Sequence, residues 1–291
     1  MTLLSDALAP STKKAYSRAW DRYNNYASIH QLPVTLPLKV EHLACFVTFL
    51  FQKGLSSSSI SSTLSALSYI HKLYCLNDPT RAFHITQLMT SIRRHRPSVD
   101  GRQPITEDLL FKILTHLPSL VSSLYEKILF KAMFLFVFYF GLRVGEVTSS
   151  THNIQFSQVI KSRSKLTLYF ATYKHSPAHP LRHSLNASNS LFCPVLAIGD
   201  YLLLRGTSAG PLFLLGGNAV TAAMFNMRLR QLLHLAGEQC RAYSAHSFRI
   251  GAASYWASKG LSDVQIRRLG RWRSDAMVRY IRGDVVHSVQ H

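Results

Sequence analysis

Acidic residues are scarce in this sequence. Its 291 residues include 14 Asp and Glu against 33 Lys and Arg, which gives a formal charge of +19 and a pI near 10.1. A protein with this excess of positive charge attracts polyanions, and nucleic acid is the first candidate.

Cysteine is also rare. The four cysteines, at positions 45, 75, 193 and 240, are widely spaced and form no C-x-x-C pair. Because no secretory segment accompanies them, we interpret them as reduced, intracellular and mostly structural. No cluster of His and Cys has the spacing of metal ligands, so we expect neither a metal nor another cofactor.

Long hydrophobic runs are missing as well. The most apolar run, 128–140, is interrupted by Lys131 and is shorter than the roughly 20 residues that a membrane span needs. We expect a buried helix there. The first residues, MTLLSDALAPST, have neither a positively charged start nor an apolar centre, so we expect no signal peptide and no membrane partner.

The chain is long enough to bury a full core, since 47% of its residues are hydrophobic. The stretch HRPSVDGRQP combines two prolines and a glycine with polar residues and is typical of a linker. We predict an N-terminal domain over 1–97, a linker over 98–104 and a second domain over 105–291. Both sides are basic, with 11 Lys and Arg against 5 Asp and Glu in the first hundred residues and 22 against 9 thereafter.

The N-terminal domain is predicted to be a bundle of roughly four helices, because apolar residues recur at helical spacing. The expected helices are one that Ser11 and Thr12 can cap, one over 40–52 with Gly54 after its end, one that begins in the serine run 56–59, and one near 86–94. In the first helix, Lys14, Arg18 and Arg22 lie mostly away from the apolar face. These cations can contact DNA, or they can form an ordinary solvated surface.

The second domain is predicted to combine helices with a small sheet. Thr106 can cap a helix with Glu107 and Asp108 in its first turn. The clearest strand is KLTLYFATY, residues 165–173, whose apolar residues alternate. The other expected elements are the long apolar helix ending at Gly141, a return strand over 182–185, and helices over 193–204 and 219–236, the last with Arg228 and Arg230 available for DNA backbone contacts.

The apolar helix is followed by GLRVGEVTSS, which places Arg143 three residues before Glu146. An Arg fixed at the end of a buried helix can donate two parallel hydrogen bonds to phosphate oxygens, which Lys cannot copy. An ordinary surface ion pair between the two residues explains the same motif, so the motif alone leaves both interpretations open.

A second motif lies near the C-terminus, in AHSFRIGAASYWASKGLSDVQIRRLGRWRSDAMVRYIR. His246 and Arg249 are three residues apart and can point into one site. A basic turn at 271–273 follows, and then Tyr280. A His, two kinds of cation and a phenol are suited to attack a phosphodiester without a metal.

Together these motifs resemble the tyrosine recombinases, the family of phage integrases and XerD-like resolvases. The GRW and YIR motifs are most similar to those of recombinases of DIRS-like and Crypton-like eukaryotic mobile elements. The resemblance implies a mainly α fold with a small β-sheet, in which an N-terminal helical core-binding domain precedes a mixed α/β catalytic domain. It also implies double-stranded DNA as the partner, a dimer on one site, a homotetramer on synapsed DNA and action in the nucleus.

The resemblance further implies how the phosphate would be bound. Arg143 and Arg249, with His246 and Trp272, would hold the two non-bridging oxygens as charge builds in the transition state. Glu146 would support Arg143. The flanking Arg271 would support these groups, and Arg273 would contact the DNA.

Tyr280 would be the nucleophile, leaving a 3′-phosphotyrosine and a free 5′ hydroxyl, with His246 as a base for its phenol. Lys174 would protonate the leaving 5′ oxygen, with Lys165 as the second choice and a solvated hairpin lysine as the alternative. The phosphotyrosine conserves the bond energy, so religation would need neither ATP nor metal.

One position departs from the family pattern. The family has a His or Trp nine residues before the nucleophile, whereas Trp272 lies eight residues before Tyr280 and Arg271 lies nine before it. We expect Trp272 to fill this role because its indole N–H is a fixed donor. The alternative is that Arg271 supplies the donor.

Three functions fit these residues. The first is a site-specific recombinase or integrase, the second a type IB topoisomerase-like nicking and closing enzyme, and the third a domesticated DNA-binding protein without activity. The complete set of catalytic residue types favours the first.

Overall fold

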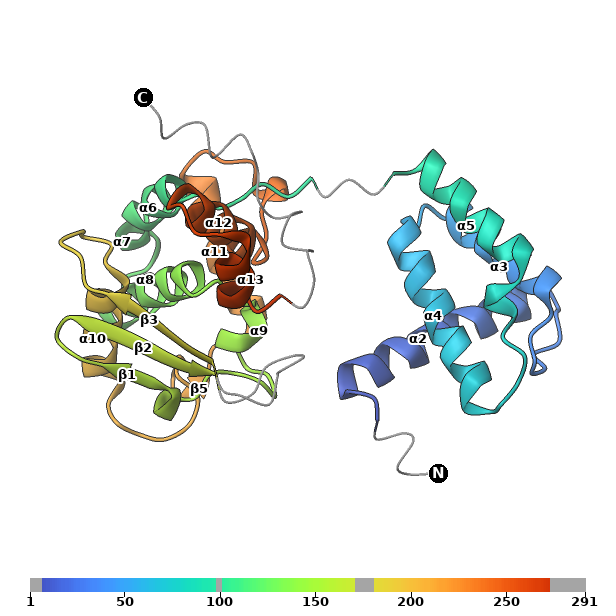
Figure 1. Ribbon diagram of the computed structural model, residues 1–291, viewed down its shortest axis with the longest axis horizontal. Helices are drawn as coiled ribbons and strands as arrows, with labels where there is room; N and C mark the ends of the chain where they lie inside the picture. The colour runs from blue at the N-terminus through green and yellow to red at the C-terminus, as the bar shows by residue number, and fades with distance from the viewer. Residues whose placement is uncertain (1–6, 98–100, 171–180, 273–291) are drawn as a thin grey trace. The chain divides into compact units, whose positions relative to one another are not determined.

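The computed structural model describes residues 7–97, 101–170 and 181–272. The chain divides into two compact units, Met1–Asp100 and Gly101–His291, and each has its own hydrophobic core. Both units are mainly helical, and the second contains the sheets (Figure 1).

The first unit is a helical bundle. Its elements are α2 (Pro10–Ile29), α3 (Val40–Gln52), α4 (Ser57–Leu73), the 3₁₀ turn η1 (Pro79–Arg81) and α5 (Phe83–His95). The serine run begins α4 as predicted, because the Ser56 hydroxyl accepts a hydrogen bond from the Ser59 amide. The predicted cap of the first helix is wrong. Pro10 already occupies the first turn of α2, and the residue before it, Ala9, makes no side-chain cap.

Aromatic residues and one histidine hold this bundle together. Tyr23 on α2 meets Phe46 on α3 edge to face, with ring centroids 5.1 Å apart. His71 is fully buried; its Nε2 accepts from the Leu38 amide at 3.0 Å, and its Nδ1 contacts the Leu67 carbonyl at 2.8 Å. The histidine therefore ties the loop before α3 to α4.

The second unit begins with helices and places its sheets in the middle of the chain. Its helices are α6 (Glu107–Thr115), α7 (Leu117–Leu120), α8 (Leu124–Tyr139), α9 (Val144–Val147), α10 (Pro194–Arg205), α11 (Ala222–Leu235), α12 (Ser247–Ser258) and α13 (Asp263–Gly270), with 3₁₀ turns η2 (Phe156–Gln158) and η3 (Cys240–Ala242). Its strands are β1 (Val159–Lys161), β2 (Lys165–Phe170), β3 (Leu181–Asn186), β4 (Leu214–Leu215) and β5 (Asn218–Ala219).

Helix α8 is the centre of this unit. From Ala132 to its end the helix is apolar on every side, as a segment surrounded by protein must be, and Phe134, Phe136 and Phe138 are each fully buried. It packs against α10 and α12 (Figure 1). Both sequence expectations for this region are confirmed: Thr106 caps α6 through a bond to the Leu109 amide, and the apolar run forms a buried helix.

The sheet has three antiparallel strands in the order β1, β2, β3, with Leu168 paired to Val159 on one side and to His183 on the other. Leu166, Leu168 and Phe170 are buried, as their alternation predicted. The predicted lysine, Lys174, falls in 171–180, outside the described residues.

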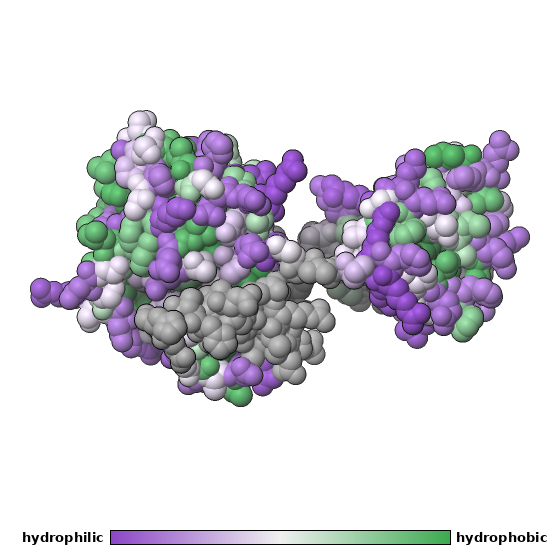
Figure 2. Space-filling view, turned by 90° about the horizontal axis from the view of Figure 1, so that it is seen from above, coloured by the Kyte–Doolittle hydropathy of each residue, from purple (hydrophilic) through white to green (hydrophobic). Residues whose placement is uncertain are grey.

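Among the described residues, no helix is long and apolar enough to cross a membrane. On the faces visible in Figure 2, hydrophobic residues are interspersed with hydrophilic ones over both units.

We predict that Gly251→Ala destabilises the second unit. An ideal Cβ at Gly251, on α12, lies 1.8 Å from the backbone oxygen of Ile105, so the added methyl must displace backbone at a cost of at least about 2 kcal/mol. Thermal unfolding followed by circular dichroism measures the loss. Gly101→Ala is the control, since nothing lies within 4 Å of a Cβ there. Equal melting temperatures for the two variants would contradict this packing.

Candidate active site

The site is built at the end of α8. Gly141 ends the helix with φ +55°, a conformation that glycine adopts at little cost. A Cβ at Gly141 would lie 2.5 Å from the Trp256 ring of α12, so this turn is pressed against α12. The chain then reaches Arg143, which directly precedes α9, and Arg143 is thereby fixed to the most rigid part of the core.

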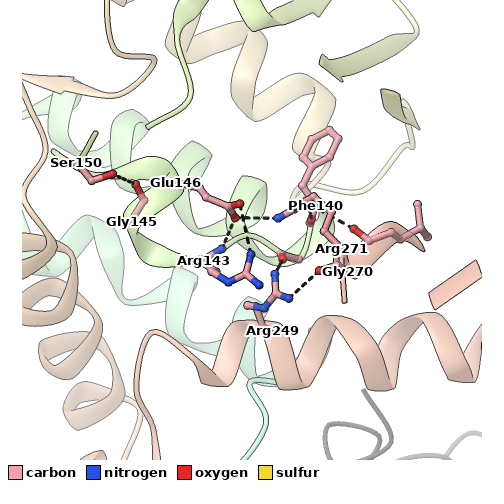
Figure 3. Close-up of polar contacts among 10 residues, drawn as sticks. Phe140, Arg143, Gly145, Glu146, Ser150, Arg249, Gly270 and Arg271 are labelled. Atoms are coloured by element: carbon pink, nitrogen blue, oxygen red, sulfur yellow. Dashed lines mark hydrogen bonds and ion pairs between the residues drawn. The ribbon is translucent and has the colours of Figure 1, made fainter. Parts of the chain in front are cut away.

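Glu146 organises this turn. Its Oε2 accepts hydrogen bonds from the Arg143 backbone amide at 2.7 Å and from Arg271 Nη2 at 2.8 Å. Its Oε1 lies 3.7 Å from Arg143 Nη1. Figure 3 shows the carboxylate between the two arginines. The motif is therefore not an isolated surface ion pair, because Glu146 is buried and shared with a residue 125 positions away.

Arg271 is buried with its charge. Its side chain is 0% exposed, its guanidinium stacks on the Phe170 ring at 4.1 Å, and Nη1 lies 3.4 Å from the Phe140 carbonyl. Its φ of +55° makes it the left-handed cap of α13. A guanidinium held in this way faces the protein interior, which disfavours the alternative that Arg271 supplies a donor to substrate.

Arg249 is also buried, at 1% exposure. Its Nη1 donates to the Gly141 carbonyl at 2.6 Å and its Nη2 donates to the Gly270 carbonyl at 2.7 Å. The Trp272 ring lies 4.7 Å from the guanidinium carbon, so Trp272 covers Arg249. Arg249 thus joins the end of α8 to the end of α13 and places both beside Arg143 (Figure 3).

His246 lies just before α12 and is partly exposed. Its backbone amide donates to the Ser244 hydroxyl at 3.2 Å, and the first turn of α12 carries Arg249 three residues later. The helix start thus carries two of the predicted phosphate ligands, as their spacing indicated.

Positive charge dominates the cluster. Arg143 and Arg271 both contact Glu146, and Arg249 lies nearby, so three arginines gather around one acidic residue in this part of the described chain. The positive charge of Arg271 also affects His183, which is buried on β3. Burial first, and then the charge of Arg271, lower the pKa of His183 to about 4. The site is therefore suited to an anion, and a neutral imidazole lies behind it.

Three predicted residues, Lys174, Arg273 and Tyr280, fall outside the described residues. Lys165 is exposed at the first position of β2, whereas Phe170, which contacts Arg271, is at the last. Lys165 therefore lies at the strand end away from the arginine cluster. The chain order places Lys174 four residues after Phe170, which favours Lys174 over Lys165.

The first unit has a groove between α2 and α4 with a volume of about 660 Å³. Its polar lining consists mainly of hydroxyls, from Ser11, Thr12, Tyr16, Ser59, Ser62, Thr63 and Ser65, together with Arg18 and Arg22. Arg22 Nη1 donates to the Thr63 hydroxyl at 3.1 Å, and Lys14 is exposed on α2 between the lining residues Thr12 and Ala15. Among the residues that the structure describes, no acidic one lines the groove.

The two arginines predicted on α11 differ. Arg230 is exposed. Arg228 is held in an ion pair with Glu126 at 2.7 Å and lies over the Phe130 ring. The expectation that the Arg228 guanidinium is available for DNA contacts is therefore corrected: its charge is already compensated within the fold.

Comparison with solved structures identifies the fold. The chain is similar to the XerH site-specific recombinase bound to a palindromic difH substrate, with a TM-score of 0.67 and 15% identity over 92% of this chain and 75% of that one. It is also similar to a lambda integrase dimer bound to a COC′ core site, with a TM-score of 0.66 and 15% identity over 97% of this chain and 75% of that one. The comparison with the Tn1549 transposon integrase in complex with transposon right end DNA gives a TM-score of 0.66 and 12% identity over 97% of this chain and 93% of that one.

No protein-family model matches the chain, and no curated protein matches it significantly. At these identities the structural likeness shows the fold, and the chain has the tyrosine recombinase fold. The predicted fold class, mainly α with a small sheet, is confirmed.

We predict that His183 makes the second unit sensitive to acid. Its pKa is about 4 in the folded protein, against the ordinary 6.5. Between these values the unfolded chain binds a proton that the folded chain does not, so the free energy of unfolding falls as pH drops from 6.5 towards 4, by at most about 3 kcal/mol.

Urea unfolding at pH 7 and pH 5 measures this effect in the wild type and in His183→Leu, which cannot titrate. The variant is expected to lose less stability between the two pH values. An unchanged pH dependence would show that His183 is not a buried neutral imidazole.

Proposed function

We propose that this protein is a site-specific DNA recombinase or integrase that cleaves and rejoins strands through a 3′-phosphotyrosine on Tyr280. The observation that carries the proposal is the convergence of Arg143 and Arg249, from motifs 106 residues apart, at the end of α8 in a tyrosine recombinase fold, where Arg249 donates to the carbonyl of Gly141, two residues before Arg143. A fold alone does not specify a function, but a cationic site of the right composition does support one.

Arg143 and Arg249 are the two guanidiniums assigned to the scissile phosphate. Arg143 is the more accessible, with 34% of its side chain exposed, and Glu146 fixes its backbone. Arg249 is oriented by two carbonyl bonds from below and by Trp272 from above. Arg143 is already fixed in place and can stabilise charge in the transition state without reorganising first, whereas Arg249, which is 1% exposed, must be uncovered before it meets the phosphate.

His246 and Trp272 are assigned to the same phosphate, His246 also as the base for the Tyr280 phenol. Attack by the phenolate forms the phosphotyrosine bond and breaks the bond to the 5′ oxygen, which takes a proton from Lys174. Reversal with a new 5′ hydroxyl rejoins the strands. Every proton and bond in this cycle is supplied by the protein and the DNA.

The hydroxyl-lined groove between α2 and α4 is assigned to the DNA backbone. Arginines and serine hydroxyls are common phosphate ligands, and Arg18 and Arg22 lie among them. With Lys14 and Arg230 they would position duplex DNA, as a dimer on one site and a tetramer on two. The eukaryotic mobile-element origin and nuclear action suggested by the GRW and YIR wording remain predictions.

We predict that the wild-type protein forms a covalent complex with DNA and that Tyr280→Phe does not. A pool of nicked duplexes with random internal sequence is incubated in buffer with chelator, washed under denaturing conditions and sequenced, which removes the need to know the target. Enrichment by the wild type alone supports the proposal. Relaxation of supercoiled plasmid without sequence enrichment would instead indicate a topoisomerase-like enzyme, and binding without capture a DNA-binding protein.

We predict that Arg18→Ala combined with Arg22→Ala weakens DNA binding and reduces its salt dependence. Each lost phosphate contact lowers the slope of log K against log[salt] by about 0.9, so the double variant should lose between about one and two. Gel-shift titrations at several salt concentrations measure this slope. Lys53→Ala, a change of an exposed cation on the same unit, should leave it unchanged.

A further inference from the structure

We infer that Arg271 is a positioning residue that holds the three catalytic segments of the site in mutual register. The inference rests on the proposed function and goes beyond it, because Arg271 replaces a substrate donor with an internal tie at the position nine residues before Tyr280. Two sets of guanidinium contacts and the position of Arg271 in the chain carry the argument.

The first contact fixes Arg143. Arg271 Nη2 and the Arg143 backbone amide share one oxygen of Glu146, at 2.8 and 2.7 Å. The carboxylate is buried, and a buried carboxylate that loses its cation either takes up a proton or moves towards water. Removing Arg271 would therefore change the orientation of Glu146 and, through it, of the Arg143 turn.

The second contact reaches the strand that leads to Lys174. The Arg271 guanidinium stacks on Phe170 at 4.1 Å, and Phe170 is the last residue of β2. Nη1 also approaches the Phe140 carbonyl at the end of α8. One planar group thus touches the end of β2 and the end of α8.

The third part of the argument is the position of Arg271 in the chain. Arg271 caps α13 in the left-handed conformation, and the direction of the chain after α13 depends on that residue. Trp272, which covers Arg249, comes next, and Tyr280 follows eight residues later. A buried guanidinium anchored at 271 therefore sets the starting point of the segment that carries the nucleophile.

The test compares Arg271→Ala, Arg271→Lys and the control Arg268→Ala, which removes an exposed arginine from the same helix. On a captured duplex, Arg271→Ala should form the covalent complex about 100-fold more slowly, because a small displacement of catalytic groups has an effect of that size. DNA affinity should change little. Arg271→Lys should recover only part of the rate, since an ammonium cannot stack on Phe170 and bond Glu146 as a planar fork does.

Added guanidinium at millimolar concentration should restore part of the cleavage rate of Arg271→Ala, because removing this buried side chain leaves an internal cavity that can hold the ion. The rate of Arg143→Ala should recover less. Hydrogen exchange is the independent readout. Arg271→Ala should speed exchange in peptides covering 143–148, whereas Arg268→Ala should not.

The outcomes separate the two claims. If the wild type captures no DNA but Arg271→Ala still loosens 143–148, the proposed function fails and the structural tie stands. If Arg271→Ala cleaves like the wild type with unchanged exchange, the positioning role is overturned. If Arg271→Ala melts below the assay temperature, Arg271→Lys takes its place. A wild-type cleavage rate for Arg271→Lys would then also overturn the positioning role.

Discussion

The carboxylate of Glu146 sits between two guanidiniums in the interior of the second unit, and the geometry of the site depends on this arrangement. A buried carboxylate is tolerated only when cations and hydrogen bonds compensate its lost hydration. Arg271 provides that compensation from inside, which leaves the more exposed Arg143 facing outward. The same carboxylate thus both stabilises the turn and selects which arginine can meet a ligand.

The surrounding core makes this arrangement rigid. The second half of α8 is buried on all sides, and close contacts at Gly141 and Gly251 pack α12 against the end of α8 and the start of the unit. Arg249 then bonds carbonyls at the ends of α8 and α13. A phosphate entering this site would meet donors whose positions are set by helix packing, which is the condition for electrostatic stabilisation of a transition state.

Much of this fold could be predicted from the sequence because its signals are local. A uniformly apolar run predicts the buried α8, alternation predicts β2, and a serine run followed by apolar periodicity predicts α4. The G-L-R-x-x-E and H-x-x-R motifs indicated Arg143, Glu146 and Arg249 for the same reason. Element starts were less certain: Pro10 begins α2 because a proline is favoured in a first turn, where Ser11 and Thr12 had seemed the better signal.

Pairings between distant residues could not be predicted. Nothing near Arg271 in the sequence shows that its charge is buried against Glu146, and this burial favours Trp272 as the donor proposed at this position. Arg228 was expected to be available for DNA contacts, yet Glu126, 102 residues away in sequence, lies beside it in space. His183 carried no motif, and its burial on β3, followed by the nearby charge of Arg271, lowers its pKa.

The most direct test of the account is tandem mass spectrometry of the captured protein after nuclease digestion. The account predicts one modified peptide, with a nucleotide attached through its 3′ phosphate to the oxygen of Tyr280. An adduct on a different side chain, or captured DNA linked through a 5′ phosphate, would contradict the assignment of the nucleophile and with it the roles given to the arginines around Glu146.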